Sequence, residues 1–137
     1  MRKTRDGLLM EIAHLMAQRS TCQRLKVGCV ITHDHRIISS GYNGVTETQD
    51  SLSECGCNPD IPCQFAIHAE ANAIAFAARM GIKLGNCSIW LTHSPCKSCA
   101  DLIIQSGISW LYYAELYRVD WTEYLENNGV RARQISH

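Results

Sequence analysis

Two short motifs carry the residue types that bind metal ions. One is His68-Ala69-Glu70, and the other is Pro95-Cys96-Lys97-Ser98-Cys99. One imidazole and two thiolates suit a tetrahedral zinc ion whose fourth position stays open for water. Cys96 and Cys99 are three positions apart in the first turn of an expected helix, so their side chains point toward one place. The partial positive charge at a helix N-terminus also favours the thiolate form.

Glu70 follows His68 by two positions, an offset at which a helix does not direct both side chains to one metal ion. Glu70 is better placed beside the metal, within reach of a bound water. Zinc lowers the pKa of that water, and a carboxylate can accept its proton and return it. A lone Cys-x-x-Cys favours a zinc site that only stabilises the fold. The adjacent glutamate and the set of only three ligands favour catalysis, and H-x-E…P-C-x-x-C is the signature of zinc deaminases.

Hydrophobic periodicity predicts the elements that position these motifs. Helices are expected at 5–20, 68–80, 96–105 and 119–127, and strands at 27–32, 36–41, 87–92, 109–114 and 130–135. An initial hairpin followed by alternating helices and strands predicts a mixed sheet with helices on both faces. The length of 137 residues fits one domain, 1–137.

Charge and hydropathy exclude some classes of function. The formal net charge is zero, which disfavours a long basic surface for nucleic acid. No run of 18 or more apolar residues predicts a membrane span, and the charged start shows no signal peptide, so we expect a cytoplasmic protein. Without a secretory signal, the eight cysteines indicate metal binding rather than disulfides. Cys29 and Cys87 lie in apolar runs and are expected in the core.

Several segments resemble the deoxycytidylate (dCMP) deaminases of the cytidine-deaminase superfamily, and phage and bacterial members are the most similar. These segments are Val27–Ile31, Gly41-Tyr42-Asn43-Gly44, His68–Ala73, Ser94–Cys99 and Ile103–Ile108. The Gly-Tyr-Asn-Gly segment is more specific to the dCMP branch than the two metal motifs. The resemblance implies a three-layer α/β/α sandwich with a five-stranded mixed sheet and a homohexamer. It also implies zinc-dependent hydrolysis of dCMP to dUMP and ammonia.

The resemblance implies roles for individual residues. Asn43 is expected to hydrogen-bond the deoxyribose, the backbone at Ala69 and Ser94 to read the pyrimidine edge, and Tyr117 to stack on the base. For the 5′-phosphate the candidate is Lys26, with Arg24 close by, although Lys26 could equally be a plain lysine at a strand edge.

Members of this family are activated by dCTP and inhibited by dTTP. The segment Gly41-Tyr42-Asn43-Gly44 is associated with that second nucleotide, and magnesium could accompany the triphosphate. Arg79 matches a position linked to nucleotide regulation in a phage relative, but a solvated charge at a helix end explains it as well.

Four further cysteines resemble extra cysteines of bacterial members. They are Cys22, Cys55, Cys57 and Cys63. Four thiolates could complete a closed structural zinc site, and the alternative is free or disulfide-linked cysteines in a flexible loop.

Two other classes of function remain open. The first is a deaminase of another base carrier, such as free cytidine, dCTP or tRNA adenosine. The neutral charge argues against tRNA. The second is a zinc module that only binds, and Glu70 argues against it, because a binding module does not use a proton shuttle.

Overall fold

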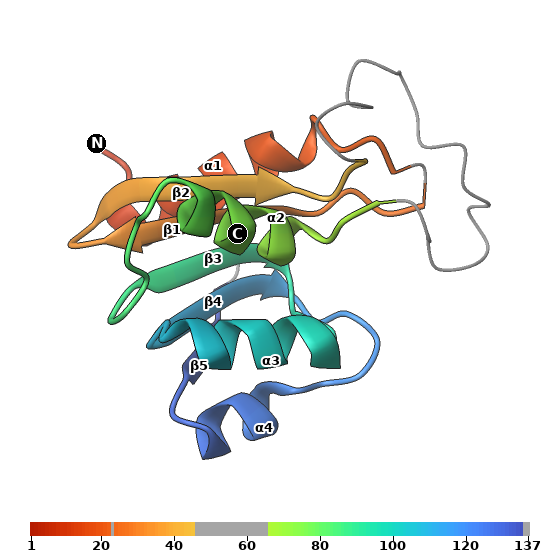
Figure 1. The fold of residues 1–137 in the computed structure, drawn as a ribbon. Helices are drawn as coiled ribbons and strands as arrows, with labels where there is room; N and C mark the ends of the chain where they lie inside the picture. The colour runs from red at the N-terminus through yellow and green to blue at the C-terminus, as the bar shows by residue number, and fades with distance from the viewer. Residues whose placement is uncertain (23, 46–65, 136–137) are drawn as a thin grey trace.

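The computed structural model describes residues 1–22, 24–45 and 66–135. Helices and strands follow in the predicted order (Figure 1). They are α1 (Arg5–Ala17), β1 (Gly28–His33), β2 (Arg36–Tyr42), α2 (Ala69–Arg79), β3 (Ser88–His93), α3 (Lys97–Ser106), β4 (Trp110–Glu115), α4 (Thr122–Asn127) and β5 (Arg131–Gln134). None of the helices described is long and apolar enough to cross a membrane.

The five strands form one sheet in the order β2-β1-β3-β4-β5. Strand β1 runs antiparallel to both of its neighbours, whereas β3, β4 and β5 are parallel. The predicted mixed sheet is therefore confirmed. In this topology, the start of β1 and the ends of β2, β3 and β4 meet at one edge of the sheet. The chain segments at this edge carry Asn43, His68, Cys96 and Tyr117, as is usual for ligand sites of open α/β sheets.

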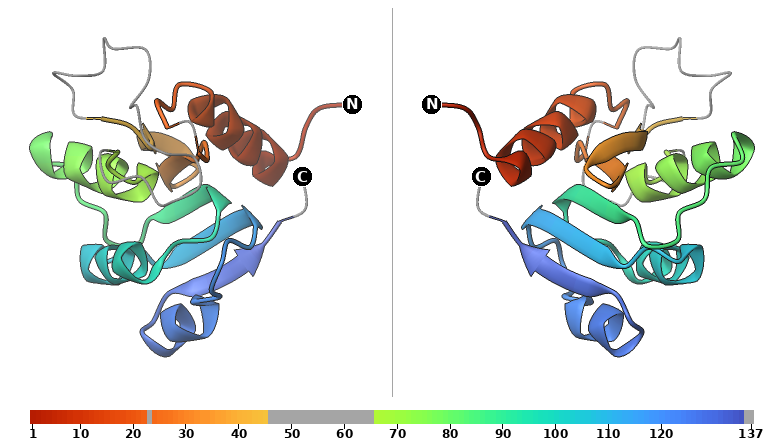
Figure 2. Two further views of the ribbon diagram at one scale, coloured as in Figure 1. Left: turned by 90° about the vertical axis from the view of Figure 1, so that its right-hand side faces the viewer. Right: turned by 90° about the vertical axis from the view of Figure 1, so that its left-hand side faces the viewer.

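Helices cover both faces of the sheet, which confirms the three-layer α/β/α fold (Figure 2). On one face, Leu9, Met10 and Ala13 of α1 pack against Val30 and Trp90. On the other face, apolar side chains of α2, α3 and α4 pack against the strand residues that alternate with those facing α1. Cys29 and Cys87 are fully buried, as their apolar surroundings predicted.

Two glycines let helices lie directly on strands. A Cβ atom added at Gly28 would lie 2.0 Å from the carbonyl oxygen of Ala13 in α1. One added at Gly41 would lie 2.5 Å from the carbonyl oxygen of Ala69 in α2. Neither distance is possible for a real side chain. The end of β2 is thus held tightly against the start of α2.

Helix ends differ from the predicted ranges by up to three residues. The helix expected at 5–20 ends at Ala17. The residues that follow donate hydrogen bonds to the third residue before them instead of the fourth, such as the bond from Arg19 N–H to the Met16 carbonyl. The helix expected at 119–127 begins at Thr122. Arg118 has a φ of 53°, outside the helical region, and the Asp120 carboxylate accepts a hydrogen bond from Thr122 N–H at 2.8 Å.

Candidate active site

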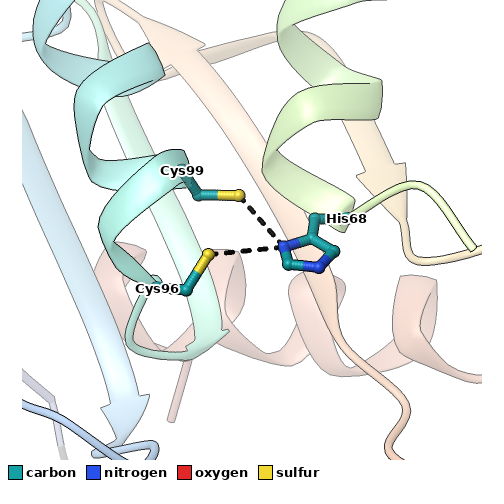
Figure 3. Close-up of side chains that lie close together, drawn as sticks. All are labelled: His68, Cys96 and Cys99. Carbon is teal, nitrogen blue, oxygen red and sulfur yellow. Dashed lines mark hydrogen bonds between the residues drawn. The ribbon is translucent and has the colours of Figure 1, made fainter. Parts of the chain in front are cut away.

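His68, Cys96 and Cys99 converge at the edge of the sheet, and we call them the metal group (Figure 3). His68 precedes the first residue of α2, Cys96 precedes that of α3, and Cys99 lies in the first turn of α3. His68 Nδ1 lies 3.2 Å from Cys99 Sγ and 3.5 Å from Cys96 Sγ. Tetrahedral zinc with normal bond lengths separates nitrogen and sulfur ligands by about 3.6 Å. The residues present therefore fit zinc.

The two thiols of the metal group differ in their protonation. Hydrogen bonds from Cys99 and His68 lower the pKa of Cys96 to about 3. The pKa of Cys99 is raised by its hydrogen bond to Cys96 and by burial. The hydrogen bond to Cys96 also raises the pKa of His68. The group thus holds negative charge at two positive helix ends, which suits a cation.

Glu70 lies in the first turn of α2 beside the metal group and is only 4% exposed. Burial raises the pKa of its carboxyl group to about 7, although its own backbone N–H and the charge on His68 act in the opposite direction. A carboxyl group with a pKa near neutrality can both take up and release a proton under physiological conditions. Its position and its proton affinity are those of a proton shuttle.

A cavity of about 220 Å³ opens over these residues. Four of the predicted substrate contacts line it together with the metal group's His68 and Cys96: Asn43, Ala69, Ser94 and Tyr117. Lys26 is not among the described residues that line the cavity. Its ammonium group is bonded to the carbonyl oxygen of Ser20 at 3.0 Å.

Asn43 and Ser94 are already engaged by the protein backbone. The Asn43 amide accepts a hydrogen bond from Val27 N–H at 2.8 Å and donates one to the Leu25 carbonyl at 2.7 Å. Ser94 N–H donates to the Glu115 carbonyl at 2.8 Å. The Ser94 backbone can therefore meet a pyrimidine only through its carbonyl oxygen.

The segment Gly41–Gly44 contacts the helix that carries Glu70. Besides the close approach at Gly41, the Asn72 side chain of α2 donates a hydrogen bond to the Tyr42 carbonyl at 2.7 Å. The Arg19 guanidinium lies 5.8 Å from the centre of the Tyr42 ring. Arg79 is the last residue of α2.

The cysteines proposed for a second zinc are only partly covered by the structure. Cys22 is buried at 3% exposure and lines the cavity. Cys55, Cys57 and Cys63 lie outside the described residues.

His93 and Arg118 line the cavity, although sequence reasoning did not single them out. His93 is the last residue of β3, and its ring meets Tyr117 edge-on with 6.3 Å between ring centroids. Its Nδ1 lies 2.8 Å from the Thr92 hydroxyl oxygen. A histidine at the carboxyl end of a predicted strand, just before the Pro-Cys motif, was a signal that could have found it.

Comparison with known proteins extends the resemblance. A family model described as the cytidine and deoxycytidylate deaminase zinc-binding region matches residues 3–115. ComE operon protein 2 of Bacillus subtilis is 41% identical over 92% of this chain and 68% of that protein. The deoxycytidylate deaminase of Enterobacteria phage T2 is 33% identical over 93% of this chain and 90% of that protein.

The dCMP deaminase of cyanophage S-TIM5, crystallised in complex with dCMP and dUMP, superposes with a TM-score of 0.88 at 29% identity. The superposition covers 98% of this chain and 99% of the cyanophage chain. With the fold, the metal group and the family model in agreement, the chain belongs to the cytidine and deoxycytidylate deaminase family.

Proposed function

We propose that this protein removes the 4-amino group of dCMP by hydrolysis and releases dUMP and ammonia. The observation that carries the reaction type is the buried Glu70 carboxyl group beside the metal group in an open cavity. Support for the substrate comes from relatives, since the phage T2 protein bears the name deoxycytidylate deaminase and the cyanophage enzyme binds dCMP and dUMP.

His68, Cys96 and Cys99 would hold the metal ion. A zinc ion bound there supplies Lewis acidity that makes water a competent nucleophile near neutral pH. Glu70 takes the proton from the water that attacks C4 of the cytosine ring and delivers it to N3. Glu70 then accepts the remaining proton of that water from the hydroxyl group now on C4 and passes it to the amino group, which leaves as ammonia as the C4 carbonyl forms. One carboxyl group thus serves both halves of the reaction.

The remaining cavity residues orient the base. The carbonyl oxygen of Ser94 accepts a hydrogen bond from the 4-amino group, since Ser94 N–H is occupied in the sheet. Ala69 is the first residue of α2, where backbone N–H groups have no acceptor within the helix, so it can donate to the pyrimidine oxygen. The Tyr117 ring stacks on the base. The Asn43 amide makes one hydrogen bond as acceptor and one as donor to the backbone, and its second N–H and second lone pair contact the sugar.

Side-by-side assays of ammonia release test the substrate. The substrates are dCMP, dCTP, deoxycytidine and cytidine, each below saturation. A charged phosphate contact is worth about 1.5–3 kcal/mol, which corresponds to roughly tenfold or more. We expect dCMP to exceed deoxycytidine by at least that factor. Equal turnover of dCMP and deoxycytidine would overturn the assignment of the substrate but leave the deaminase intact.

We also propose that dCTP activates and dTTP inhibits the enzyme at one site near Tyr42 and Gly44, with Arg79 and magnesium assisting the triphosphate. Support comes from the contacts of Gly41 and Tyr42 with α2, the helix that carries Glu70. An effector acts only by binding two states differently, so the two nucleotides should shift the apparent KM for dCMP in opposite directions. If neither nucleotide changes the apparent KM for dCMP while dCMP is still turned over, the proposed regulation is wrong and the proposed reaction stands.

A homohexamer and a structural zinc held by Cys22, Cys55, Cys57 and Cys63 complete the proposal. Light scattering measures the mass of the assembly. Metal analysis should find close to two zinc ions per chain, and Cys57→Ser should lower that number and the stability. A content of one zinc per wild-type chain rules out the second site.

A further inference from the structure

Ser20 is bonded to residues of the cavity wall without being part of that wall. It is 6% exposed and is not among the described residues that line the cavity. Its hydroxyl group donates a hydrogen bond to the carbonyl oxygen of Asn43 at 2.6 Å and accepts one from Cys22 N–H at 3.1 Å. Its backbone N–H donates to the Ala17 carbonyl at the end of α1, and its own carbonyl accepts from the Lys26 ammonium group, each at 3.0 Å. Every polar group of this buried residue therefore has a partner.

We propose that Ser20 is a positioning residue for substrate binding. It holds Asn43 in the orientation in which the Asn43 amide contacts the sugar, and it does not touch the substrate itself. This inference rests on the proposed deamination of dCMP, in which Asn43 is a substrate contact. Ser20 therefore affects the affinity for the substrate and not the chemical step.

Asn43 lies just beyond the part of the sheet that could hold it. The last residue pair between β1 and β2 at this edge joins Gly28 and Tyr42, and Asn43 is the next residue after β2. Asn43 N–H donates to the Val27 carbonyl at 3.1 Å, and its side-chain amide accepts from Val27 N–H at 2.8 Å. These bonds join two segments that both extend past the strands. The bond from Ser20 ties this pair to a second element, because the backbone of Ser20 is attached to the end of α1.

The bond between Ser20 and Asn43 is shielded from bulk water, since both residues are buried. A buried carbonyl that loses its donor has to find another partner or turn toward water. Asn43 lines the cavity, which offers that water. Rotation of the Asn43 peptide group toward the cavity would also move its side chain, because both are attached to one Cα atom. Loss of the Ser20 hydroxyl group should therefore weaken the contact with the sugar.

The metal group has anchors of its own. The carbonyl oxygens of His68 and Cys96 accept the first backbone hydrogen bonds of α2 and α3, both at 2.9 Å. One link from the segment held by Ser20 to the metal group is the backbone pair of Gly44 with Ile67, the residue before His68. That pair makes two hydrogen bonds, at 3.0 Å and 2.7 Å, and neither uses the Ser20 hydroxyl. We therefore expect kcat and zinc content to depend little on Ser20.

The test compares Ser20→Ala with Ser39→Ala in the zinc-loaded full chain. Ser39 is a matched control, because it is 4% exposed, is not among the described lining residues and donates its hydroxyl hydrogen to the Ala73 carbonyl at 2.8 Å. Each variant thus loses one buried hydrogen bond to a backbone carbonyl. Ser20→Ala should raise KM for dCMP and KM for deoxycytidine alike by about three- to tenfold, with kcat within about twofold of wild type. Ser39→Ala should leave both KM values unchanged.

Calorimetry with dUMP adds a readout that does not depend on turnover. The dissociation constant of dUMP should rise by the same factor in Ser20→Ala alone, and thermal unfolding should show that both variants are folded. A double-mutant cycle tests the route, since Ser20→Ala should have little further effect on dUMP binding once Asn43→Ala has removed the side chain. Wild-type affinity in Ser20→Ala, an equal loss in Ser39→Ala, or additive losses in the cycle would each overturn the inference.

Failure of this inference can be separated from failure of the proposed function. If the wild-type chain releases no ammonia from dCMP but Ser20→Ala weakens dUMP binding relative to Ser39→Ala, the proposed reaction is wrong and the positioning role stands. If the wild-type chain converts dCMP and Ser20→Ala keeps the wild-type KM, only the positioning role is wrong.

Discussion

The metal group and the hydrogen-bonded pair Arg24–Tyr117 contribute to one cavity but differ in how the sequence brings their residues together. The metal group comes from two helix starts, and each contribution is a motif of a few consecutive residues. Arg24 and Tyr117 both lie in loops and are separated by 93 positions in the sequence. The proposed reaction chemistry therefore depends on residues that are close in sequence, whereas the cavity wall around it also depends on contacts between distant segments.

The region matched by the family model covers the cavity residues unequally. Its match spans residues 3–115, which include the whole metal group and Arg24 but end before Tyr117 and Arg118. The matched region thus contains every residue of the metal group but not Tyr117, the proposed stacking partner of the base.

Removal of the metal ion should produce the largest effect. Chelation should abolish deamination of every substrate, because the metal group serves the reaction and not the phosphate. Added zinc should restore the activity, and Cys96→Ser should resist that rescue. Residual turnover by a chain that metal analysis shows to hold no zinc would contradict the assignment of the reaction to the metal group.

Glu70→Gln should have the next largest effect. Proton shuttling is typically worth about 10²–10⁴-fold, and one carboxyl group serves both halves of the reaction here, so a loss at or above the upper value is expected. The loss should be the same for dCMP and deoxycytidine. Zinc content and thermal unfolding should stay close to wild type. Near-normal turnover by the folded, zinc-loaded variant would remove Glu70 from the mechanism.

His93→Leu should have a modest effect on both substrates, because His93 supports the Tyr117 ring rather than the phosphate. An edge-on aromatic contact is worth about 0.5–1.5 kcal/mol, or about two- to tenfold in kcat/KM. A residue that contacts only the phosphate would instead lower kcat/KM for dCMP and leave kcat/KM for deoxycytidine unchanged. A loss confined to dCMP would place His93 with the phosphate contacts instead.

The smallest expected effect is on stability and depends on pH. Burial lowers the pKa of His93, opposed by the charge of Glu115 and assisted by that of His14. The unfolded chain, with a histidine pKa of about 6.5, then binds more protons than the folded one in the window below that value. The contribution of His93 to the stability of the fold is complete above about pH 6.5. It is lost as the pH falls toward the pKa that His93 has in the folded protein. In denaturant unfolding of zinc-loaded protein, the free energy of unfolding should fall less steeply below pH 6.5 in His93→Leu than in wild type. The same pH dependence in both proteins would contradict this account.

The order of helices and strands, the layers and the metal motifs could be predicted from the sequence, because each depends on local periodicity or spacing. Helix ends were less predictable. The helix expected from 119 begins at Thr122, whose N–H is bonded to the Asp120 carboxylate, and a periodic pattern does not show such a local hydrogen bond. Lys26 was the predicted phosphate contact, with Arg24 named only as close by, and only the packed structure shows that Arg24 lines the cavity and Lys26 does not. His93 was missed because its partners, Thr92 apart, lie on other segments of the chain.

The distance along the chain between Arg24 and Tyr117 also bears on how the protein acquires activity as it folds. Parallel pairing of β3 with β4, and of β4 with β5, requires crossover connections, and contacts between distant segments form slowly. Helices can form earlier, from local sequence alone. During refolding, the helical circular dichroism signal should therefore return before dCMP turnover does. Catalytic recovery is thus a stricter measure of the native state of this chain than its secondary structure content.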